Sequence, residues 1–528
     1  MKFKNRKDEI LAQHAEKMEN ETRERATQEF NKTHELARTV MLHADHPIPT
    51  TRRQLLGAGL MSGFSVLAVP SIFTLAAQSA YGVECAKGGA AGAGGAHAPG
   101  YLHVELSGGY SAARNFVPGK QEAGAAFQPL MAAGYATIGY GPTQVPPTVA
   151  LDTTMVGTLH PTSQLLAGMK EVMSAAALGK TAVAAICAVS GDDTANNPHN
   201  PVQLVSKIAG NFGSLIQIGG TTNGTNTLGR TAPLNIAQDP GLAKAAIANE
   251  AAVGNLVTPG LLATRFANDP QAAVRVAELA HKLSASKLAQ FQQKDLNQQV
   301  KDLIECGYLG AKDLLTEFTA DKLAVTKDTA LNTTYNAIPF ATTFGIAGNQ
   351  QSMIMSKLMA DGLATTGSLV LAGYDYHGQG LPAQDAKDKA AGQAIGLALE
   401  VAHRKGQALF VAVTTDGSVT FNGGGAADRL AASADNGARS MMLMFAIGAT
   451  AQPKMNFTQI GKFNDGGAVD TSYLATSNTA AVASLCLAYN YASFAGRLPQ
   501  FQAALAAAGQ ADPFSANAQQ YQAFAPKV

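Results

Sequence analysis

Polar residues that can do chemistry follow apolar segments of this chain at four places. Asp375 and His377 stand two residues apart, directly after Ala372-Gly373, so in an extended segment both side chains leave the same face. A carboxylate beside an imidazole suits a divalent cation or a phosphoryl-type oxyanion. The pair also suits a capped turn with a hydrogen-bonded histidine, so both interpretations stay open. The four places are Ser107–Ser111, Asp192–His199, Asp375–His377, and Asp416-Gly417 together with Asp435-Asn436.

The carboxylates of the fourth place stand beside glycines. Asp416-Gly417 directly follows the apolar segment Leu409–Thr415, and Asp435-Asn436-Gly437 precedes the last apolar segment. A carboxylate at the end of a strand can ligate a metal. Asp-Gly is also a very common turn sequence, so each aspartate predicts either a ligand or a turn.

The first place offers a nucleophile. Ser111 follows Gly108-Gly109-Tyr110 at the tip of a short predicted strand, where a serine is either an exposed nucleophile or a helix cap. The sequence is not the GxSxG turn of α/β-hydrolases. His103 and Glu105 share one face of that strand, either as inward polar groups or as part of an exposed edge.

Alternating strands and helices must position these residues. Continuous apolar strands that alternate with helices predict an α/β fold with a mainly parallel sheet covered by helices on both faces. Ligands of such sheets bind beyond the carboxyl ends of the strands, where the four places fall. The predicted strands are Tyr101–Leu106, Thr181–Val189, Ser368–Ala372, Ala408–Thr414 and Ser440–Ile447, and the main helices are Ser163–Leu178 and Asp388–Lys405.

Composition divides the chain into segments. A mostly helical insertion, predicted at about 240–366, includes the Gln-rich stretch Pro270–Phe318 and caps the sheet. The predicted segments are a charged helical region at 1–50, a signal segment at 51–82, a Gly/Ala-rich linker at 83–100, the α/β domain at 101–510 and a loose tail at 511–528.

The signal segment predicts export. Arg52-Arg53 is followed by an apolar run, Gln54–Val83, which contains no Asp, Glu, Lys or Arg. This is typical of a twin-arginine signal, so we expect the twin-arginine translocase as a partner during export and a periplasmic or other extracytoplasmic location. Cleavage is expected near residues 80–83. An uncleaved signal would instead tether the domain to the inner membrane.

Charge and cysteine content exclude some classes of protein. The net charge is +1 and charged residues make up 15% of the chain, which gives no electrostatic reason for binding nucleic acid. Cys85, Cys187, Cys306 and Cys486 show no zinc-site spacing. One or two disulfides are compatible with export. Cys187 lies in an apolar run, which predicts that it is a buried free thiol.

These segments, in this order, resemble a family of uncharacterised bacterial proteins that are exported by the twin-arginine route and related in fold to the alkaline phosphatase and sulfatase superfamily. The resemblance covers about residues 100 to 450. The matching segments are Val104-Glu-Leu-Ser-Gly-Gly109, Leu159-His-Pro161, Thr181–Val189, Gly373-Tyr-Asp-Tyr-His377, Leu409–Thr415 and Asp435-Asn-Gly437.

The chain departs from the family's pattern at three points. Asn436 stands where the family has a histidine, Thr415-Asp-Gly-Ser418 stands where relatives have a run like Ser-Glu-Phe-Gly-Arg, and the turn after Gly109 lacks an acidic residue. Asparagine is a far poorer metal ligand than imidazole. These departures put a two-metal site in doubt.

The resemblance implies two functions between which the sequence does not decide. One is a catalytically degenerate binding or assembly module of the envelope, with an envelope protein as partner. The alternative is a periplasmic metal-dependent hydrolase of phosphate or sulfate esters. In that case one divalent metal ion would be held by Asp375, His377, Asp416 and Asp435, with His199 as a further ligand or donor, and Ser111 would be the nucleophile.

Overall fold

The computed structural model describes the α/β part of the chain. The described residues are 98–526 except 147, 191–199, 211, 214–215, 222–243, 258–274, 276–319, 333–346 and 423–430. All of them belong to one compact unit. The predicted charged segment, the signal segment and nearly all of the linker lie outside the described residues, as does most of the predicted insertion.

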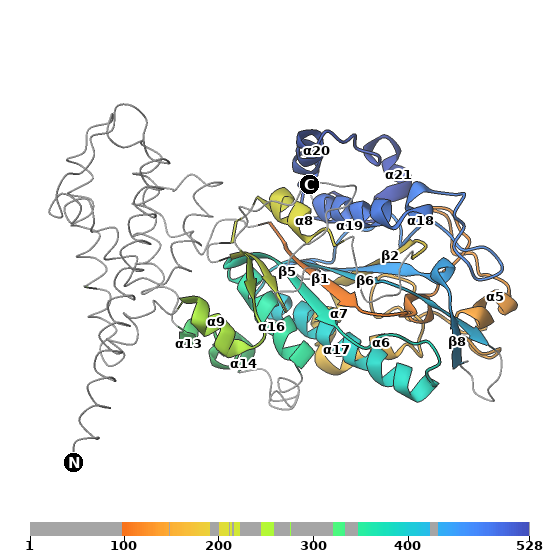
Figure 1. The fold of residues 1–528 in the computed structure, drawn as a ribbon, viewed down its shortest axis with the longest axis horizontal. Helices are drawn as coiled ribbons and strands as arrows, with labels where there is room; N and C mark the ends of the chain where they lie inside the picture. The colour runs from red at the N-terminus through yellow and green to blue at the C-terminus, as the bar shows by residue number, and fades with distance from the viewer. Residues whose placement is uncertain are drawn as a thin grey trace, which may run out of the picture. The chain divides into compact units, whose positions relative to one another are not determined.

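Eight strands form one sheet, in the order β10-β2-β9-β6-β1-β5-β3-β4 (Figure 1). Strand β1 lies inside the sheet, parallel to β5 on one side and to β6 on the other. Strand β9 alone runs antiparallel to its neighbours, β6 and β2, among the described strands of this sheet. The predicted α/β class and mainly parallel sheet are thereby confirmed. The strands are β1 Gly100–Leu106, β2 Thr181–Cys187, β3 Ile216–Gly220, β4 Lys244–Ala246, β5 Ala364–Leu371, β6 Leu409–Thr415, β9 Met441–Ile447 and β10 Gln459–Ile460.

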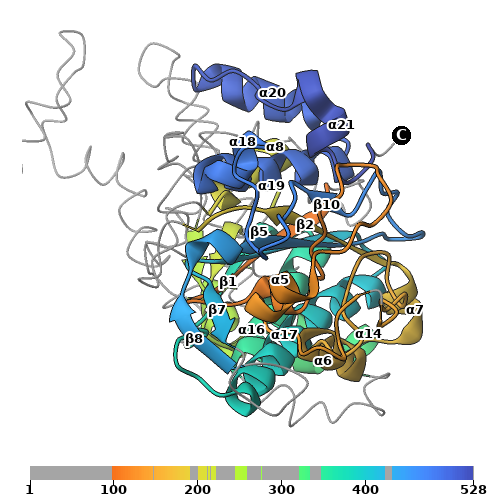
Figure 2. The same cartoon turned by 90° about the vertical axis from the view of Figure 1, so that its right-hand side faces the viewer.

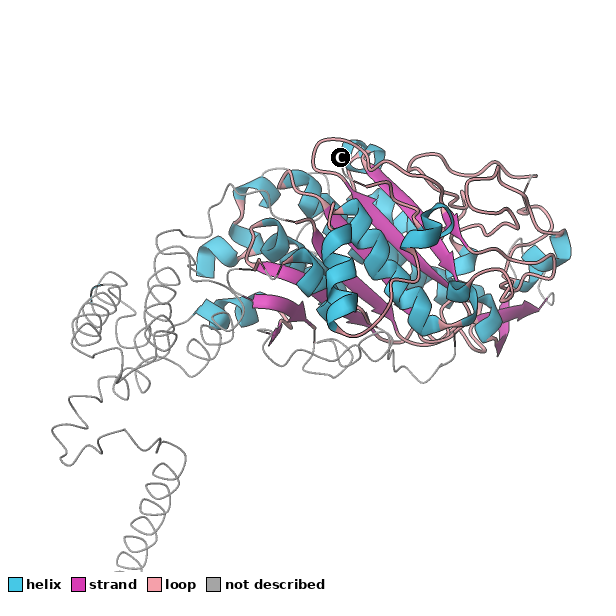
Figure 3. Cartoon of the chain, turned by 90° about the horizontal axis from the view of Figure 1, so that it is seen from above, coloured by secondary structure: helices cyan, strands magenta, loops and turns pink. Residues whose placement is uncertain are grey.

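Helices cover both faces of the sheet, as Figures 2 and 3 show. Helices α6, α16 and α17 lie on one face, and α8, α19 and α20 lie on the other. Burial on both sides explains why the strands read as apolar runs in the sequence. The helices are α6 Gln164–Val172, α8 Val202–Ala209, α16 Ala347–Ala360, α17 Leu381–Arg404, α19 Ala480–Phe494 and α20 Leu498–Ala507.

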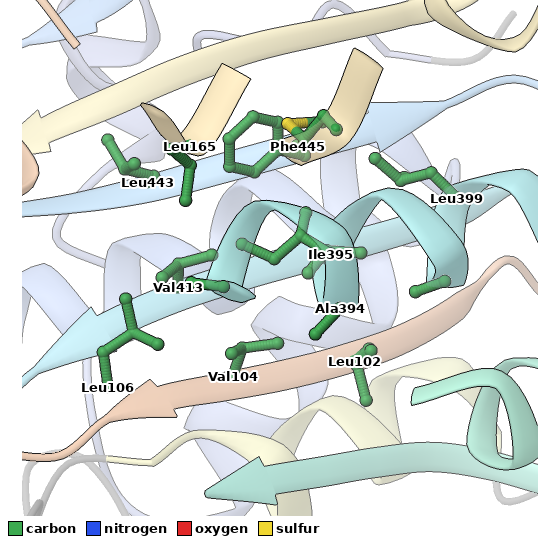
Figure 4. Packing of buried hydrophobic residues seen from close by; sticks show 14 of the residues in the cluster. Leu102, Val104, Leu106, Leu165, Ala394, Ile395, Leu399, Val413, Leu443 and Phe445 are labelled. Carbon is green, nitrogen blue, oxygen red and sulfur yellow. The ribbon is translucent and has the colours of Figure 1, made fainter. Parts of the chain in front are cut away.

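Strand β1 contributes to both halves of the core. Its side chains alternate between the two faces of the sheet. Leu102, Val104 and Leu106 pack toward α17, where Ala394 and Ile395 meet them (Figure 4). Tyr101 and the other odd-numbered residues face the opposite side, where Tyr101 joins the second hydrophobic cluster. The strand is therefore held firmly where its carboxyl end leaves the sheet.

Two predicted helices have different bounds. The helix predicted at Ser163–Leu178 is two helices, α6 and α7 Ala175–Gly179. Ser174 starts the second one, because its Oγ accepts the N–H of Ala177 at 3.2 Å. The carboxylate of Glu400 accepts hydrogen bonds from both the N–H and the hydroxyl of Ser174. These side-chain bonds fix the break between α6 and α7. The helix predicted from Asp388 begins one to two turns earlier, as α17.

The predicted insertion and tail also differ from the structure. The range 240–366 includes strand β4 and the start of β5, beside the helices α9 Glu250–Val257, α13 Ala320–Leu323, α14 Thr329–Asn332 and α16. The end of the chain was expected to be loose from residue 511. Instead, Phe514 and Phe524 are fully buried, and residue 524 pairs with Met455. Aromatic packing therefore fixes this segment as far as Phe524.

Two cysteines lie in the described core. Cys187 and Cys486 are buried free thiols, and burial raises the pKa of each. The predicted free thiol at Cys187 is confirmed, whereas Cys85 and Cys306 lie outside the described residues. None of the helices in the described part of the chain is both long enough and apolar enough to cross a membrane.

Candidate functional site

Three of the predicted places meet at the carboxyl end of the central strands. In the register of the sheet, Leu106 of β1 pairs with Leu371 of β5 and with Thr415 of β6. The turns that follow these strands are therefore neighbours, although Asp375 and Asp416 come about 270 and 310 residues after Gly108 in the sequence. We call them the Gly108 turn, the Asp375 turn and the Asp416 turn.

The backbone of the Gly108 turn binds both of the others. Tyr374 and Tyr376 donate their N–H groups to the carbonyls of Ser107 and Gly109, at 2.9 and 3.3 Å. The N–H of Gly417 donates to Gly108 O at 3.2 Å. Gly108 has a φ of +119°, and a Cβ there would lie 2.4 Å from the backbone nitrogen of Asp375. Only glycine fits this crossing without a shift of the chain.

The carboxylate of Asp416 accepts a hydrogen bond from the Gly108 turn. Its side chain is buried, with 3% exposed, and its Oδ1 accepts the backbone N–H of Gly108. The carbonyl of Asp416 in turn accepts the hydroxyl of Ser190, beyond β2. The carboxylate predicted as either ligand or turn residue therefore has a turn-fixing hydrogen bond.

Asp375 and His377 lie at the surface, in a turn of their own. Both residues are exposed, and Asp375 Oδ1 accepts the N–H of His377 at 2.9 Å. The capped turn that the sequence left open is thus present. Asp375 Oδ1 also lies close to Gly109, where a Cβ would be 3.4 Å away. The two side chains do not form the extended pair that the spacing suggested.

Ser111 is neither exposed nor a capping residue. It occupies the N-cap position directly before the short helix η1, Ala112–Arg114, but its side chain makes no capping hydrogen bond. Ser111 is fully buried, and its Oγ has no hydrogen-bond partner in the described part of the chain. The spacing of the sequence did not reveal this burial.

The remaining predicted ligands are not placed as side chains. Asp435 ends strand β8, Ala431–Asp435, which pairs with β7, Val419–Asn422. Only its backbone is described, and His199 lies outside the described residues. Asn436 is described, and it fixes a turn: Oδ1 accepts the N–H of Ala438 at 3.0 Å, while Nδ2 donates to Thr420 Oγ1 at 2.9 Å.

His103 and Glu105 are inward polar groups rather than an exposed edge. They are 0% and 1% exposed. Burial lowers the pKa of His103 to about 3, so the ring is neutral, with Nε2 3.0 Å from Thr414 Oγ1 and Nδ1 3.3 Å from Tyr101 Oη. Ser107 Oγ donates to Glu105 Oε1 at 3.2 Å. These residues form a buried polar row beneath the Gly108 turn.

Sequence reasoning missed a buried ion cluster beside this site. Arg114 is fully buried, and its Nη2 lies 2.6 Å from Asp388 and 2.5 Å from Asp385 of α17. Asp388 also accepts the Tyr376 hydroxyl at 2.7 Å. Burial alone lowers the pKa of Arg114, but the charge of Asp388 raises it above its usual value. Two signals were available: Arg114 is the sole charged residue between Glu105 and Lys120, and the two aspartates are three residues apart.

The described residues do not assemble a metal centre. No three His, Cys, Asp or Glu side chains come together in the part of the chain that the structure describes. The oxygens best placed for a cation at this edge, on Asp416 and Asp375, accept backbone N–H groups. The metal site predicted from Asp375, His377, Asp416, Asp435 and His199 stays a prediction, since His199 and the side chain of Asp435 lie outside the described part.

Comparisons of this chain with protein families, with curated proteins and with solved structures found no match. The resemblance to the exported alkaline phosphatase-like family stays a prediction.

Proposed function

We propose that this chain is an exported envelope protein whose alkaline phosphatase-like domain is catalytically degenerate and acts as a binding or assembly module. One observation carries the proposal. The carboxylates at the edge of the sheet hold turns together, because Asp416 binds the N–H of Gly108 and Asp375 binds the N–H of His377. Asn436 supports the same view, since both ends of its amide are hydrogen-bonded, one to Ala438 of its own turn and the other to Thr420 of β7.

The energies of these hydrogen bonds favour the proposal. If a metal ion displaced the N–H of Gly108 from Asp416 Oδ1, that N–H would be left without an acceptor inside the protein. A buried donor that loses its acceptor costs about 1–3 kcal/mol.

One observation favours the alternative, a hydrolase of phosphate or sulfate esters. Ser111 Oγ is buried without a hydrogen-bond partner in the described residues, and unused buried hydroxyls are uncommon in folded proteins. A movement of the Gly108 turn would be needed to present this hydroxyl to an ester. The two proposals therefore differ in whether Ser111 and the metal ligands matter for a measurable activity.

Elemental analysis of the exported protein separates the two functions. We expect metal-free wild-type protein whose melting temperature does not change when divalent cations are added, and no ester hydrolysis that Ser111→Ala removes. The variant Asp375→Ala/His377→Ala tests the metal ligands. Asp375→Asn/His377→Gln is its matched control, because asparagine keeps the turn acceptor. A stoichiometric metal lost in both variants would overturn the binding-module proposal in favour of a hydrolase.

The export step has its own test. Replacing the pair by Arg52→Lys/Arg53→Lys keeps the charge but removes the paired guanidiniums that a twin-arginine signal requires. We expect the precursor to accumulate in the cytoplasm, measured by fractionation and immunoblotting. Replacing Lys2 and Lys4 by arginine is the control, and it should leave export unchanged. Export of the double-lysine variant at the wild-type level would contradict the assignment of the signal.

A further inference from the structure

Arg439 lies at the same edge of the sheet as the three turns. It ends the short helix η5, Gly437–Arg439, two residues before β9 begins. Because β9 is antiparallel, its first residue, Met441, lies beside the carboxyl end of β2, where it pairs with Cys187. Arg439 therefore stands where ligands of such sheets enter, next to the loop that follows β2.

The backbone that carries Arg439 is held from several sides. Ser190, beyond β2, donates its N–H to Gly437 O at 2.9 Å. A Cβ on Gly437 would lie 2.1 Å from Ser190 O, so the two loops are in direct contact. Asn436 caps the turn through the N–H of Ala438, whose carbonyl accepts the N–H of Val469 at 2.8 Å. The position of Arg439 is thus fixed before any ligand arrives.

The guanidinium of Arg439 has no counter-charge among the residues that the structure describes. Arg439 is partly buried, and its Nε is inaccessible to solvent with no acceptor in the described part of the chain. No ion pair joins Arg439 to a described carboxylate. Burial lowers the pKa of Arg439, with no contribution from a charge of the described residues. A cation that has lost hydration without gaining an anion is suited to bind one.

A neighbouring loop carries a second donor without a partner. Ser418 is 1% exposed, and its Oγ has no hydrogen-bond partner among the described residues. Its carbonyl accepts the N–H of Asn436 at 2.8 Å, which ties this loop to the Arg439 turn. A hydroxyl and a guanidinium on adjoining rigid loops are the donors that bind oxyanions in proteins.

We propose that Arg439 is an anion-binding residue, and that the ligand of this edge carries an oxyanion group such as a phosphate, a sulfate or a carboxylate. The inference rests on the proposed binding function and names the chemistry of its ligand. The planar fork of the guanidinium matches two oxygens of such a group, which a lysine ammonium cannot do.

Binding of inorganic phosphate, sulfate and acetate tests the inference. The full exported chain is titrated with each ion at constant ionic strength, set with sodium chloride, and followed by calorimetry and by melting temperature. We expect at least one of the three ions to bind the wild type, with an affinity at least tenfold weaker in Arg439→Gln and intermediate in Arg439→Lys. The ion that binds most tightly identifies the group.

A matched control is Arg497→Gln. Arg497 is also partly buried, but it lies at the start of α20, away from the edge. Its substitution should leave anion binding unchanged. Circular dichroism should show that both glutamine variants fold, since neither arginine has an ion-pair partner in the described residues.

The outcomes separate this inference from the proposed function. No binding of any of the three ions, or equal binding by wild type and Arg439→Gln, would overturn the inference and leave the metal-free binding module in place. Anion binding that depends on Arg439 in a protein that also holds a stoichiometric metal would support the inference and overturn the binding-module proposal.

Discussion

Two arginines near the carboxyl edge of the sheet have opposite surroundings. Arg114 is fully buried between Asp388 and Asp385, with its guanidinium over the rings of Tyr376 and Phe421 at 5.7 and 5.8 Å. Arg439 is partly buried and has no carboxylate partner in the described residues. Both have a buried Nε without an acceptor there, so the two arginines differ in the depth of burial and in the counter-charge.

The two surroundings imply different roles: the charge of Arg114 stabilises the fold, and the charge of Arg439 is suited to bind a ligand. Removing one partner of a buried pair leaves the other uncompensated, and this is strongly destabilising. Removing a partly desolvated charge that has no partner relieves a cost instead. The Arg114 cluster joins the Gly108 turn, the Asp375 turn and α17 through Tyr376 and Asp388. The guanidinium of Arg439 has no ion-pair partner in the described part of the chain, so we infer that its partner is a ligand.

The largest effect expected from this comparison is that of Arg114→Met. It leaves the carboxylate of Asp388 buried without its cation, so we expect a loss of about 3–5 kcal/mol in the free energy of unfolding. Urea denaturation measures it. The double variant Arg114→Met/Asp388→Asn removes both charges and should recover a large part of the loss. If both variants were equally unstable, packing rather than charge would explain the role of Arg114.

Arg114 is buried as a paired charge and Arg439 is partly buried without a described partner. His103 is a third case, because it is buried in its neutral form. Its pKa is 6.5 in an ordinary environment and about 3 in the fold, because burial disfavours the imidazolium. Below pH 6.5 the unfolded chain binds a proton that the folded chain does not, so stability falls as the pH falls toward 3. We expect a slope of about 1.4 kcal/mol per pH unit.

Denaturation at several pH values between 6.5 and 5 gives the cleanest measurement, since most carboxylates do not yet titrate there. His103→Gln keeps a polar side chain beside Thr414 but has no proton to gain, and it should lose this slope. A histidine signal in NMR that titrates near pH 6.5 in the folded protein, assigned to His103, would contradict the expectation.

The pattern of apolar residues along the sequence predicted the strands of the sheet better than the contacts of the candidate site. Strands β1, β2 and β6 were found because burial on both faces makes them continuous apolar runs. The break at Ser174 was missed because it depends on Glu400, which comes from another helix. Arg114 was missed for the same reason, since its partners lie 271 and 274 residues away. A sequence shows which residues can ionise, but only the fold decides which of them meet.

The turn residues illustrate the same limit. Asp375-x-His377 and Asp416-Gly417 were each compatible with a metal ligand or a turn. Which of the two forms depends on where the Oδ1 atom of the aspartate points. That direction is set by a backbone N–H on the same turn for Asp375 and on the Gly108 turn for Asp416. Spacing along the chain cannot encode it.

The smallest effect, and the one that decides the comparison, is that of Arg439→Met. Methionine keeps most of the apolar stem and removes a charge that has no described counter-ion, so the free energy of unfolding should stay constant or rise by up to about 1 kcal/mol. The sign is opposite to that of Arg114→Met. Urea denaturation in chloride buffer without phosphate, sulfate or carboxylate measures it, because a bound anion would stabilise only the wild type. A loss of about 3 kcal/mol or more, of the size expected for a broken buried pair, would mean that Arg439 stabilises the fold as Arg114 does.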